Sequence, residues 1–331
     1  MASSRVVRFA RVGGPEVLEI ADVERPAPGP SQILVEVEAA GLNRADVLQR
    51  RGLYPAPPGS PQDVPGLEYA GRVAALGEGV RDFAVNDRVM GIVGGGAMAT
   101  HLVVHEREAM HVPGAVSTAL AAAIPEAFLT AFDALQMQAD FRFGESVLVH
   151  AAASGVGTAA IQLARLGGAL VLGTSRSEEK LARCMELGLQ VPLLVAPGTA
   201  HFAAHVRAHS GRGADVILDL VGGAYLEENL EALAVGGRLV VLGLLGGPGA
   251  SLPLAKVLQK RLRVMGSVLR SRPLEEKASL AQAFSQRVLP FFAPRGPLAP
   301  VVCAEVPMRE IADAHARMER NDTFGKIVLV W

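Results

Sequence analysis

Residues 147–157 join a short apolar segment to a turn of small residues, a pattern that can bind a diphosphate. Val147-Leu148-Val149 is followed by His150-Ala-Ala-Ala-Ser-Gly-Val-Gly157 and an Ala/Leu-rich run to Leu166. A strand that turns directly into a helix presents backbone N–H groups and the positive helix end to phosphate. We therefore expect a dinucleotide at this turn, held by Ala152, Ser154, Gly155, Val156 and Gly157.

The glycine pattern of this turn is incomplete. The G-x-G-x-x-G register falls on Ala152, Ser154 and Gly157, so only the third glycine is present. The setting supports the prediction, because Gly167-Gly168 ends the expected helix 155–166 and a second apolar segment follows at once. The alternative is an ordinary strand-to-helix turn without a ligand.

The end of that second segment distinguishes two cofactors. An NAD site places Asp or Glu there to accept from the ribose 2′-OH, whereas a 2′-phosphate needs hydroxyls and cations. The chain has no acid at this point, and we expect NADPH to be held by Thr174, Ser175, Arg176, Ser177 and Lys180. The alternative is that Ser177 only caps the next helix and Arg176 is a solvated loop charge.

Composition excludes several classes of protein. The 331 residues carry a formal net charge of −1, so no basic surface for nucleic acid or anionic lipid is expected. We read no membrane span and no apolar leader at the N-terminus, and expect a cytoplasmic protein. Cys184 and Cys303 are the only cysteines, too few for a disulfide framework or a zinc site built from several thiolates.

The pattern of apolar residues predicts two domains. Short apolar runs separated by Pro/Gly-rich connections predict a β-rich, barrel-like module over about the first 120 residues. Alternating strands (146–149, 170–173, 215–220, 238–242) and helices follow, which is typical of a doubly wound parallel sheet. Helices at 274–289 and 308–320 and a strand at 326–330 return to the first module. We therefore assign residues 1–120 and 264–331 to one domain and 121–263 to the cofactor domain.

Four motifs resemble the medium-chain dehydrogenase/reductase superfamily, and within it the zinc-free quinone oxidoreductases. They are Leu42-Asn-Arg-Ala-Asp46, Pro65-Gly-Leu-Glu68, the 150–157 turn and Gly325-Lys326. The likeness is strongest to the tumour-suppressor-induced quinone oxidoreductases of animals, which also share Leu269-Arg-Ser-Arg272. The resemblance implies a doubly wound parallel Rossmann sheet inserted in a β-rich GroES-like catalytic domain.

The resemblance also implies the roles of individual residues. It nominates Asn43 and Tyr54 as hydrogen-bond donors to a substrate oxyanion, although a turn residue and a loop aromatic are the plain alternatives. Asp46 can be a helix cap, and Glu68 a buried acid in a structural ion pair. Further cofactor contacts are expected from Thr130, Gly243, Leu244, Leu245, Leu269, Arg270, Ser271, Asn321 and Lys326.

Two departures from family patterns bear on the chemistry. Asn43 and Leu67 stand where zinc alcohol dehydrogenases have Cys and His, so we expect no catalytic metal. Val195 stands where the animal relative has a Tyr near the 2′-phosphate, which predicts weaker discrimination between NADPH and NADH.

Without a strong Lewis acid, the substrate should accept reducing equivalents readily. We expect an NADPH-dependent quinone oxidoreductase that reduces small ortho-quinones in the interdomain cleft without zinc or flavin. A conjugated enone or alkenal reductase is the alternative within enzymes, and a nicotinamide-binding protein without catalysis is the alternative outside them. As in the family, edge strands near 238–243 and 263–269 should pair cofactor domains into a homodimer.

Overall fold

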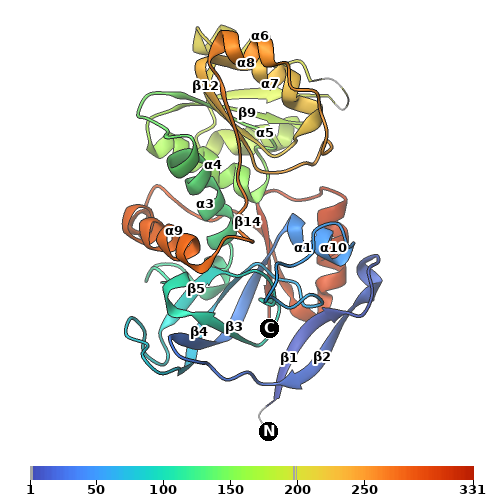
Figure 1. The fold of residues 1–331 in the computed structure, drawn as a ribbon, viewed down its shortest axis with the longest axis vertical. Coiled ribbons are helices and arrows are strands. Elements are labelled where there is room, and N and C mark those ends of the chain that lie inside the picture. Colours follow the sequence, from blue (N-terminus) through green and yellow to red (C-terminus); the bar gives the residue numbers. More distant parts are fainter. Residues whose placement is uncertain (1–2, 197, 199) are drawn as a thin grey trace. The chain divides into compact units, whose positions relative to one another are not determined.

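The computed structural model describes residues 3–196, 198 and 200–331 and divides the chain into two compact units (Figure 1). The first unit consists of Met1–Leu129 and Leu269–Trp331, and the second of Thr130–Val268. The chain therefore leaves the first unit once and returns to it. Both joins fall later than the expected boundaries after residues 120 and 263. At the second join, the strand Arg263–Gly266 pairs with its neighbour in the second unit and so belongs there.

Strands dominate the first unit. Their bounds are β1 (Ser3–Phe9), β2 (Leu18–Glu24), β3 (Gln32–Leu42), β4 (Glu68–Leu76), β5 (Arg88–Ile92), β6 (His101–His105), β7 (Ala109–His111), β14 (Val302–Pro307) and β15 (Lys326–Val330). β1 and β2 form a two-stranded antiparallel ribbon. The remaining strands form a seven-stranded sheet in the order β14-β15-β3-β4-β5-β7, with β6 also pairing β3. This is the β-rich module that the short apolar runs predict.

Short helices and turns complete the first unit. They are η1 (Pro15–Val17), α1 (Arg44–Arg50), η2 (Glu106–Glu108), α2 (Thr118–Ala121), α3 (Pro125–Phe132, which ends past the join), α9 (Leu274–Arg287), η5 (Leu289–Phe291), η6 (Met308–Glu310) and α10 (Ile311–Glu319). Val47 of α1 packs in one apolar cluster with Leu42 of β3 and Ile327 of β15. The start of α1 is thereby fixed against the centre of the sheet, which matters for the side chains at residues 43–46.

The second unit is a parallel sheet with helical connections. Its strands are β8 (Ser146–Val149), β9 (Leu170–Ser175), β10 (Val191–Leu194), β11 (Ala214–Asp219), β12 (Leu233–Val241) and β13 (Arg263–Gly266). The sheet order is β10-β9-β8-β11-β12-β13, so the order reverses between β8 and β11. Helices that connect strands on opposite sides of such a reversal lie on opposite faces, and ligands bind beside it at the carboxyl ends of the strands. The predicted doubly wound sheet is confirmed.

The helical elements of the second unit are η3 (Asp133–Gln138, a π-helical segment), α4 (Gly155–Leu166), α5 (Glu178–Glu186), α6 (Ala203–Ser210), η4 (Gly223–Tyr225), α7 (Leu226–Ala232) and α8 (Leu254–Lys260). α4 has the predicted bounds. β12 begins at Leu233, five residues before the predicted strand, because Gly236 has a φ of 79° and interrupts the apolar pattern without ending the strand. The register against β11 shifts at the same place.

One helical run passes a length-and-composition test for a membrane span. Thr118–Gln138 is apolar enough, but 72% of its tested window is buried inside the protein. A core helix of a water-soluble domain passes the same test, so this run carries no argument for a membrane. The sequence analysis expects no run of this length and apolar composition, and Thr118–Gln138 is one.

Candidate functional site

The turn after β8 has the geometry expected of a phosphate-binding helix start. Ser154 caps α4, and its hydroxyl accepts a hydrogen bond from the Gly157 N–H at 3.0 Å. The N–H groups of Gly155 and Val156, the first two residues of the helix, have no intrahelical acceptor and are the donors such a turn offers to an anion. Ala152 is fully buried and its N–H donates to Thr174 O, so this residue shapes the turn.

Gly157 is required by close approach of the backbone. A Cβ at this position would lie 2.5 Å from Ala151 O and 2.6 Å from Ala152 O. Both atoms belong to the backbone and cannot swing aside as a flexible side chain can. The third glycine of the incomplete motif is therefore the one that lets the helix start where it does.

The segment after β9 presents hydroxyls and an exposed cation. Ser177 caps α5 and accepts from the Lys180 N–H at 3.3 Å, and Ser175 Oγ accepts from the Ser177 N–H at 3.2 Å. Arg176 between them is exposed. The predicted capping role of Ser177 is confirmed. Both serine hydroxyls accept in these bonds, so their hydrogens can still be donated to a ligand.

Thr174 lies elsewhere than expected. It is 2% exposed and lies in a stretch of β9, residues 171–174, in which every residue is buried. Its hydroxyl bonds to His150 Nδ1 at 2.8 Å. The expectation that Thr174 holds the cofactor is corrected on this point: its hydroxyl is used inside the protein.

His150 belongs to a buried chain of hydrogen bonds that the sequence alone did not reveal. Its Nε2 lies 2.6 Å from Asn229 Oδ1, while Asn229 Nδ2 donates to Asp219 Oδ2 at 3.0 Å. Nε2 therefore carries the proton and Nδ1 accepts from Thr174. Burial lowers the pKa of His150, so the ring is neutral. Asp219 also accepts from the N–H of Val221 at 2.7 Å. The bonds among Thr174, His150, Asn229 and Asp219 tie the carboxyl ends of β9, β8 and β11 together.

Three of the remaining residues predicted in the second unit lie at that edge. Gly243, Leu244 and Leu245 follow β12, and the two leucines are 54% and 55% exposed. The Gly243 N–H donates to Asp219 O at 3.3 Å. Thr130 is half-buried in α3.

In the first unit, Asn43 is the first member of a dense polar network. It caps α1, and its backbone N–H donates to Asp46 Oδ2 at 2.8 Å. Its side-chain amide donates to Glu68 Oε1 at 2.8 Å and to Gly41 O at 3.2 Å, while Oδ1 accepts from Lys326 Nζ at 2.5 Å. The structure thus directs both amide hydrogens at the protein. Asn43 fits a positioning role better than the expected donor to a substrate.

Lys326 and Glu68 form a buried ion pair beneath Asn43. The Nζ–Oε1 distance is 2.6 Å, and the side chains are 5% and 0% exposed. The ammonium also donates to Leu42 O at 2.8 Å, so its three hydrogens all have acceptors. Lys326 therefore lies within the network and not on an exposed cofactor rim. The structural role foreseen for Glu68 is confirmed.

Asp46 holds the backbone on both sides of the network. Its Oδ2 accepts from the Asn43 N–H, and Oδ1 accepts from the Gly66 N–H at 2.8 Å. Burial raises the pKa of this carboxyl to about 6. The capping role foreseen for Asp46 is confirmed, and the bond to Gly66 adds a tie to the segment before β4.

Arg270 holds the loop that contains Tyr54 in place through hydrogen bonds. Its guanidinium donates to Gly94 O at 2.6 Å, to Tyr54 O at 3.1 Å and to Gln49 Oε1, and lies 5.1 Å from the centre of the Tyr54 ring. The residue is 4% exposed. The sequence predicts that Arg270 contacts the cofactor. In the structure its guanidinium N–H groups donate instead to carbonyl oxygens of the protein. Leu269 beside it is buried as well.

Tyr54 itself remains available to a ligand. Its side chain is half-buried, and its hydroxyl makes no hydrogen bond with the described residues. Burial raises the pKa of the phenol, so it is a donor at neutral pH. Two other predicted residues of the first unit, Ser271 and Asn321, are exposed, and Asn321 Oδ1 accepts from Arg44 at 2.7 Å.

Glu126 was missed by the sequence reasoning. Its backbone N–H donates to Glu68 Oε2 at 2.8 Å, which places the residue at the network. Burial, reinforced by the charge of Glu68, raises the pKa of its carboxyl to about 8. The signal was present: Glu126 is the one Asp, Glu, Lys or Arg between Glu108 and Asp133.

Two positions of the first unit, Asn43 and Leu67, supply no ligand for a catalytic zinc ion. Asn43 uses its amide within the protein, and Leu67 is an apolar side chain buried to 1% exposure. Zinc is held by thiolate, imidazole and carboxylate, and neither of these two positions supplies one. Over residues 3–196, 198 and 200–331, no group of three or more His, Cys, Asp or Glu side chains is arranged so that it could hold a metal ion.

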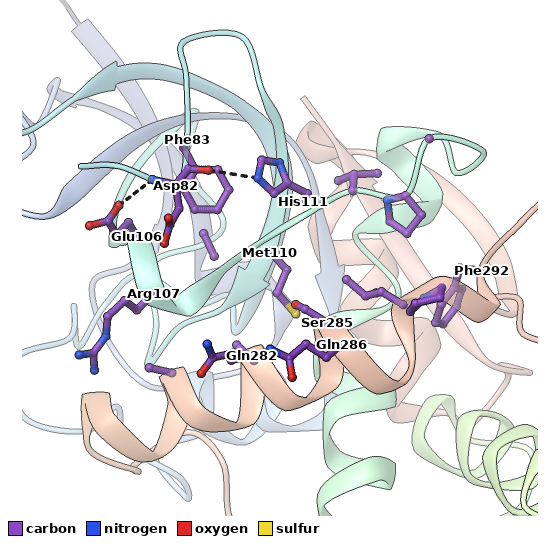
Figure 2. A pocket seen from close by; sticks show the side chains of 18 of the residues that line it. Asp82, Phe83, Glu106, Arg107, Met110, His111, Gln282, Ser285, Gln286 and Phe292 are labelled. Atoms are coloured by element: carbon purple, nitrogen blue, oxygen red, sulfur yellow. Dashed lines mark hydrogen bonds between the residues drawn. The ribbon is translucent and has the colours of Figure 1, made fainter.

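A cavity of about 1180 Å³ lies in the first unit and is lined by none of the predicted site residues. Figure 2 shows Gln282, Ser285 and Gln286 of α9 along one wall and Met110 and His111 across from them. The cavity is broad and open and contains no part of the Asn43–Lys326 network.

Two family models match the chain. The model described as alcohol dehydrogenase GroES-like domain matches residues 29–114, and the one described as zinc-binding dehydrogenase matches residues 155–286.

Quinone oxidoreductases are among the similar proteins. That of Lama guanicoe is 33% identical over 330 residues, covering 98% of this chain and 97% of the relative. That of Homo sapiens is 30% identical over 331 residues with the same coverage.

Among solved structures, the quinone oxidoreductase of Pseudomonas syringae is 32% identical with a TM-score of 0.85, covering 99% of this chain and 100% of that one. The CurK enoyl reductase is 28% identical with a TM-score of 0.85, covering 99% of both chains. The resemblance drawn from the motifs is confirmed.

Replacing Gly157 by Ala should destabilise the second unit by about 1–3 kcal/mol, because the added methyl group overpacks against fixed backbone oxygens. Chemical denaturation monitored by circular dichroism measures the change. Gly249→Ala is the matched control, since a Cβ there meets nothing within 4 Å. Equal stability of both variants would show that the close approach at Gly157 is not needed.

Proposed function

From the premise that this chain belongs to the medium-chain dehydrogenase/reductase superfamily, we propose that it is an NADPH-dependent quinone oxidoreductase working without zinc or flavin. Relatives named quinone oxidoreductase match over nearly the whole chain at 30–33% identity. Their coverage of both units supports a reaction that needs both of them. NADPH, when bound, supplies the reducing equivalents.

The observation that carries the cofactor part of the proposal is the exposed Arg176 between two serine hydroxyls at the carboxyl end of β9. A cation and hydroxyl donors suit a 2′-phosphate, and a site for NAD would carry an acid here. The start of α4 holds the diphosphate through the Gly155 and Val156 N–H groups. The buried chain from Thr174 to Asp219 keeps the strand ends in place.

The first unit supplies the substrate contacts. The half-buried Tyr54 hydroxyl donates to the substrate oxygen and stabilises negative charge that develops there during reduction. Arg270 holds the Tyr54 loop, and Asn43 holds its part of the network in place. No zinc ion is needed for a quinone, because reduction restores aromaticity and the carbonyl requires little polarisation.

A second function is favoured by one comparison. Enoyl reductases share the fold over the whole chain, and parts of polyketide synthases are 36% and 41% identical over about two thirds of it. An enone reductase would use the same Tyr54 hydroxyl to stabilise an enolate. The two functions differ in which substrate the site takes.

Purified protein should oxidise NADPH rapidly with 1,2-naphthoquinone, and more slowly with a conjugated alkenal such as 2-hexenal. The loss of absorbance at 340 nm measures both rates, and NADH serves as the cofactor control. A higher kcat/KM for the alkenal would move the chain to the enone reductases. If neither substrate is reduced while NADPH still binds, the protein has a non-catalytic role.

Arg176→Ala should raise the KM for NADPH by roughly 10-fold or more and leave the KM for NADH unchanged, because the lost charge-assisted hydrogen bond serves only the 2′-phosphate. Steady-state kinetics with each cofactor give both constants. Arg165→Ala, an exposed arginine at the far end of α4, is the matched control. An equal change with both cofactors would contradict the assignment of Arg176.

We also propose that two copies associate through the edge of the parallel sheet. β13 is the last strand in the sheet order, and Val264 on it is 38% exposed. Leu254 and Leu258 of the neighbouring α8 are 70% and 79% exposed and lie one turn apart on the same helix face. An apolar edge of this kind is protected when another copy covers it.

Val264→Lys should shift the elution volume in gel filtration from dimer to monomer, because a charge would be buried at the shared edge. Leu194→Lys places the same charge on β10, at the opposite edge of the sheet, and should leave the elution volume unchanged. A dimer that persists in the Val264→Lys protein would remove β13 from the interface.

A further inference from the structure

The outer edge of β7 offers backbone groups that no described strand uses. β7 is the last strand in the order of the seven-stranded sheet and pairs with β5 on one side only. The Val112 N–H donates to Arg88 O at 3.0 Å, and antiparallel strands turn alternate residues toward each other. The N–H and C=O of His111 and the C=O of Ala109 therefore point away from β5. Within the described part of the chain, these three groups have no hydrogen-bond partner.

Helix α9 forms the opposite wall of a groove along this edge. Its residues Gln282, Ser285 and Gln286 are three or four positions apart and so lie on one helix face. Figure 2 shows these side chains along one wall of the 1180 Å³ cavity, with Met110 and His111 across from them. Over the residues that the structure describes, the three polar side chains make no hydrogen bond. Both walls of the groove thus carry unused donors and acceptors.

Ion pairs hold the first turn of α9 in place. Lys277 Nζ lies 2.7 Å from Glu108 Oε1, and these side chains are 14% and 13% exposed. Arg107 Nη2 lies 2.5 Å from Glu275 Oε2. Both partners of α9 belong to η2, which leads directly into β7. The two walls are therefore joined at one end before a ligand binds, and binding need not order them.

The lining of the groove carries more acids than cations. The lining acids are Asp82, Glu106 and Glu275, and the lining cation is Arg107. Arg107 is already paired with Glu275, and Glu106 accepts from two backbone N–H groups. The Asp82 carboxylate is exposed and has no partner among the described residues. Its backbone O lies 3.2 Å from His111 Nε2, so this unpaired charge lies beside the outer edge of β7.

We propose that a short extended peptide segment of another protein, with a cationic side chain between apolar ones, binds in this groove as an added strand on β7. A peptide residue opposite His111 exchanges two backbone hydrogen bonds with it. The cationic side chain of that residue lies on the His111 face, beside Asp82. Its apolar neighbours point to the other face, where Met110 lies. The Gln282 and Gln286 amides can bond to the outer edge of the peptide. This inference does not depend on the proposed function.

The dimensions of the groove favour a peptide over other occupants. Its volume of about 1180 Å³ exceeds the roughly 300–1,000 Å³ of sites for small molecules. β7 has three residues, and α9 closes the groove on the other side, so one strand fits there better than the edge of a second sheet. The unused backbone groups also match a peptide backbone, which repeats one donor and one acceptor per residue.

The peptide acetyl-Thr-Val-Arg-Val-Thr-amide is the probe, and isothermal titration calorimetry with the full chain measures its affinity. Methylation of the arginine backbone nitrogen should weaken binding by roughly 10-fold or more, because it removes the donor to His111 O. Glutamate in place of that arginine should weaken binding similarly, because it repels Asp82. Hydrogen exchange at the His111 amide should slow when the unmodified peptide binds.

Two variants locate the binding site. Ser285→Trp fills the groove and should weaken binding of the arginine peptide by roughly 10-fold or more, while circular dichroism confirms the fold. Asp82→Asn should weaken binding by about 3-fold, as expected for an exposed ion pair. Asp22→Asn, an exposed aspartate on β2, is the matched control and should bind as the wild type does.

Several results would overturn the proposal. Absence of binding at about 1 mM peptide would mean that the groove does not take a peptide. Equal affinity for the methylated peptide would exclude strand pairing, and equal affinity of the Ser285→Trp protein would place the peptide elsewhere. A change of elution volume in the Ser285→Trp protein would show that a second copy of the chain occupies the groove.

Discussion

The buried ion pair between Lys326 and Glu68 is the interaction on which the polar network of the first unit depends. Two charges out of water are stable only when hydrogen bonds satisfy them fully, and removing one partner of such a pair costs about 3–5 kcal/mol. Here the remaining bonds go to Asn43, to Leu42 O and to the N–H of Glu126. The pair therefore fixes the start of α1 and the start of α3 at once.

Charge balance accounts for the raised pKa of one acid in this network. Lys326 and Arg270 carry two positive charges, and the carboxylates of Glu68 and Asp46 can neutralise both of them. A third carboxylate would have no cation left to face it, and burial would penalise its charge. Glu126 is the acid whose charged form is least stabilised. Its carboxyl group alone accepts no hydrogen bond from a backbone N–H, whereas Glu68 and Asp46 accept three such bonds between them.

The sequence predicts local features of this site well and distant pairings poorly. The strand-turn-helix of 146–166, the cap at Ser177 and the cap at Asp46 depend on neighbouring residues, and the structure has all of them. Arg270 was misplaced because its acceptor Gly94 O lies 176 positions away in the chain. Thr174 was misplaced for the same reason, because its hydroxyl pairs with His150, 24 positions away in the chain.

The position of Lys326 after the second unit in the chain has a consequence for synthesis on the ribosome. The second unit is contiguous, so it can fold while later residues are still being translated. The first unit cannot bury Glu68 with its cation until β15 has emerged and paired with β3, which brings residues 42 and 327 together. A nascent chain that has not yet reached residue 326 would thus carry a folded second unit while Glu68 of the first unit still lacks its cation.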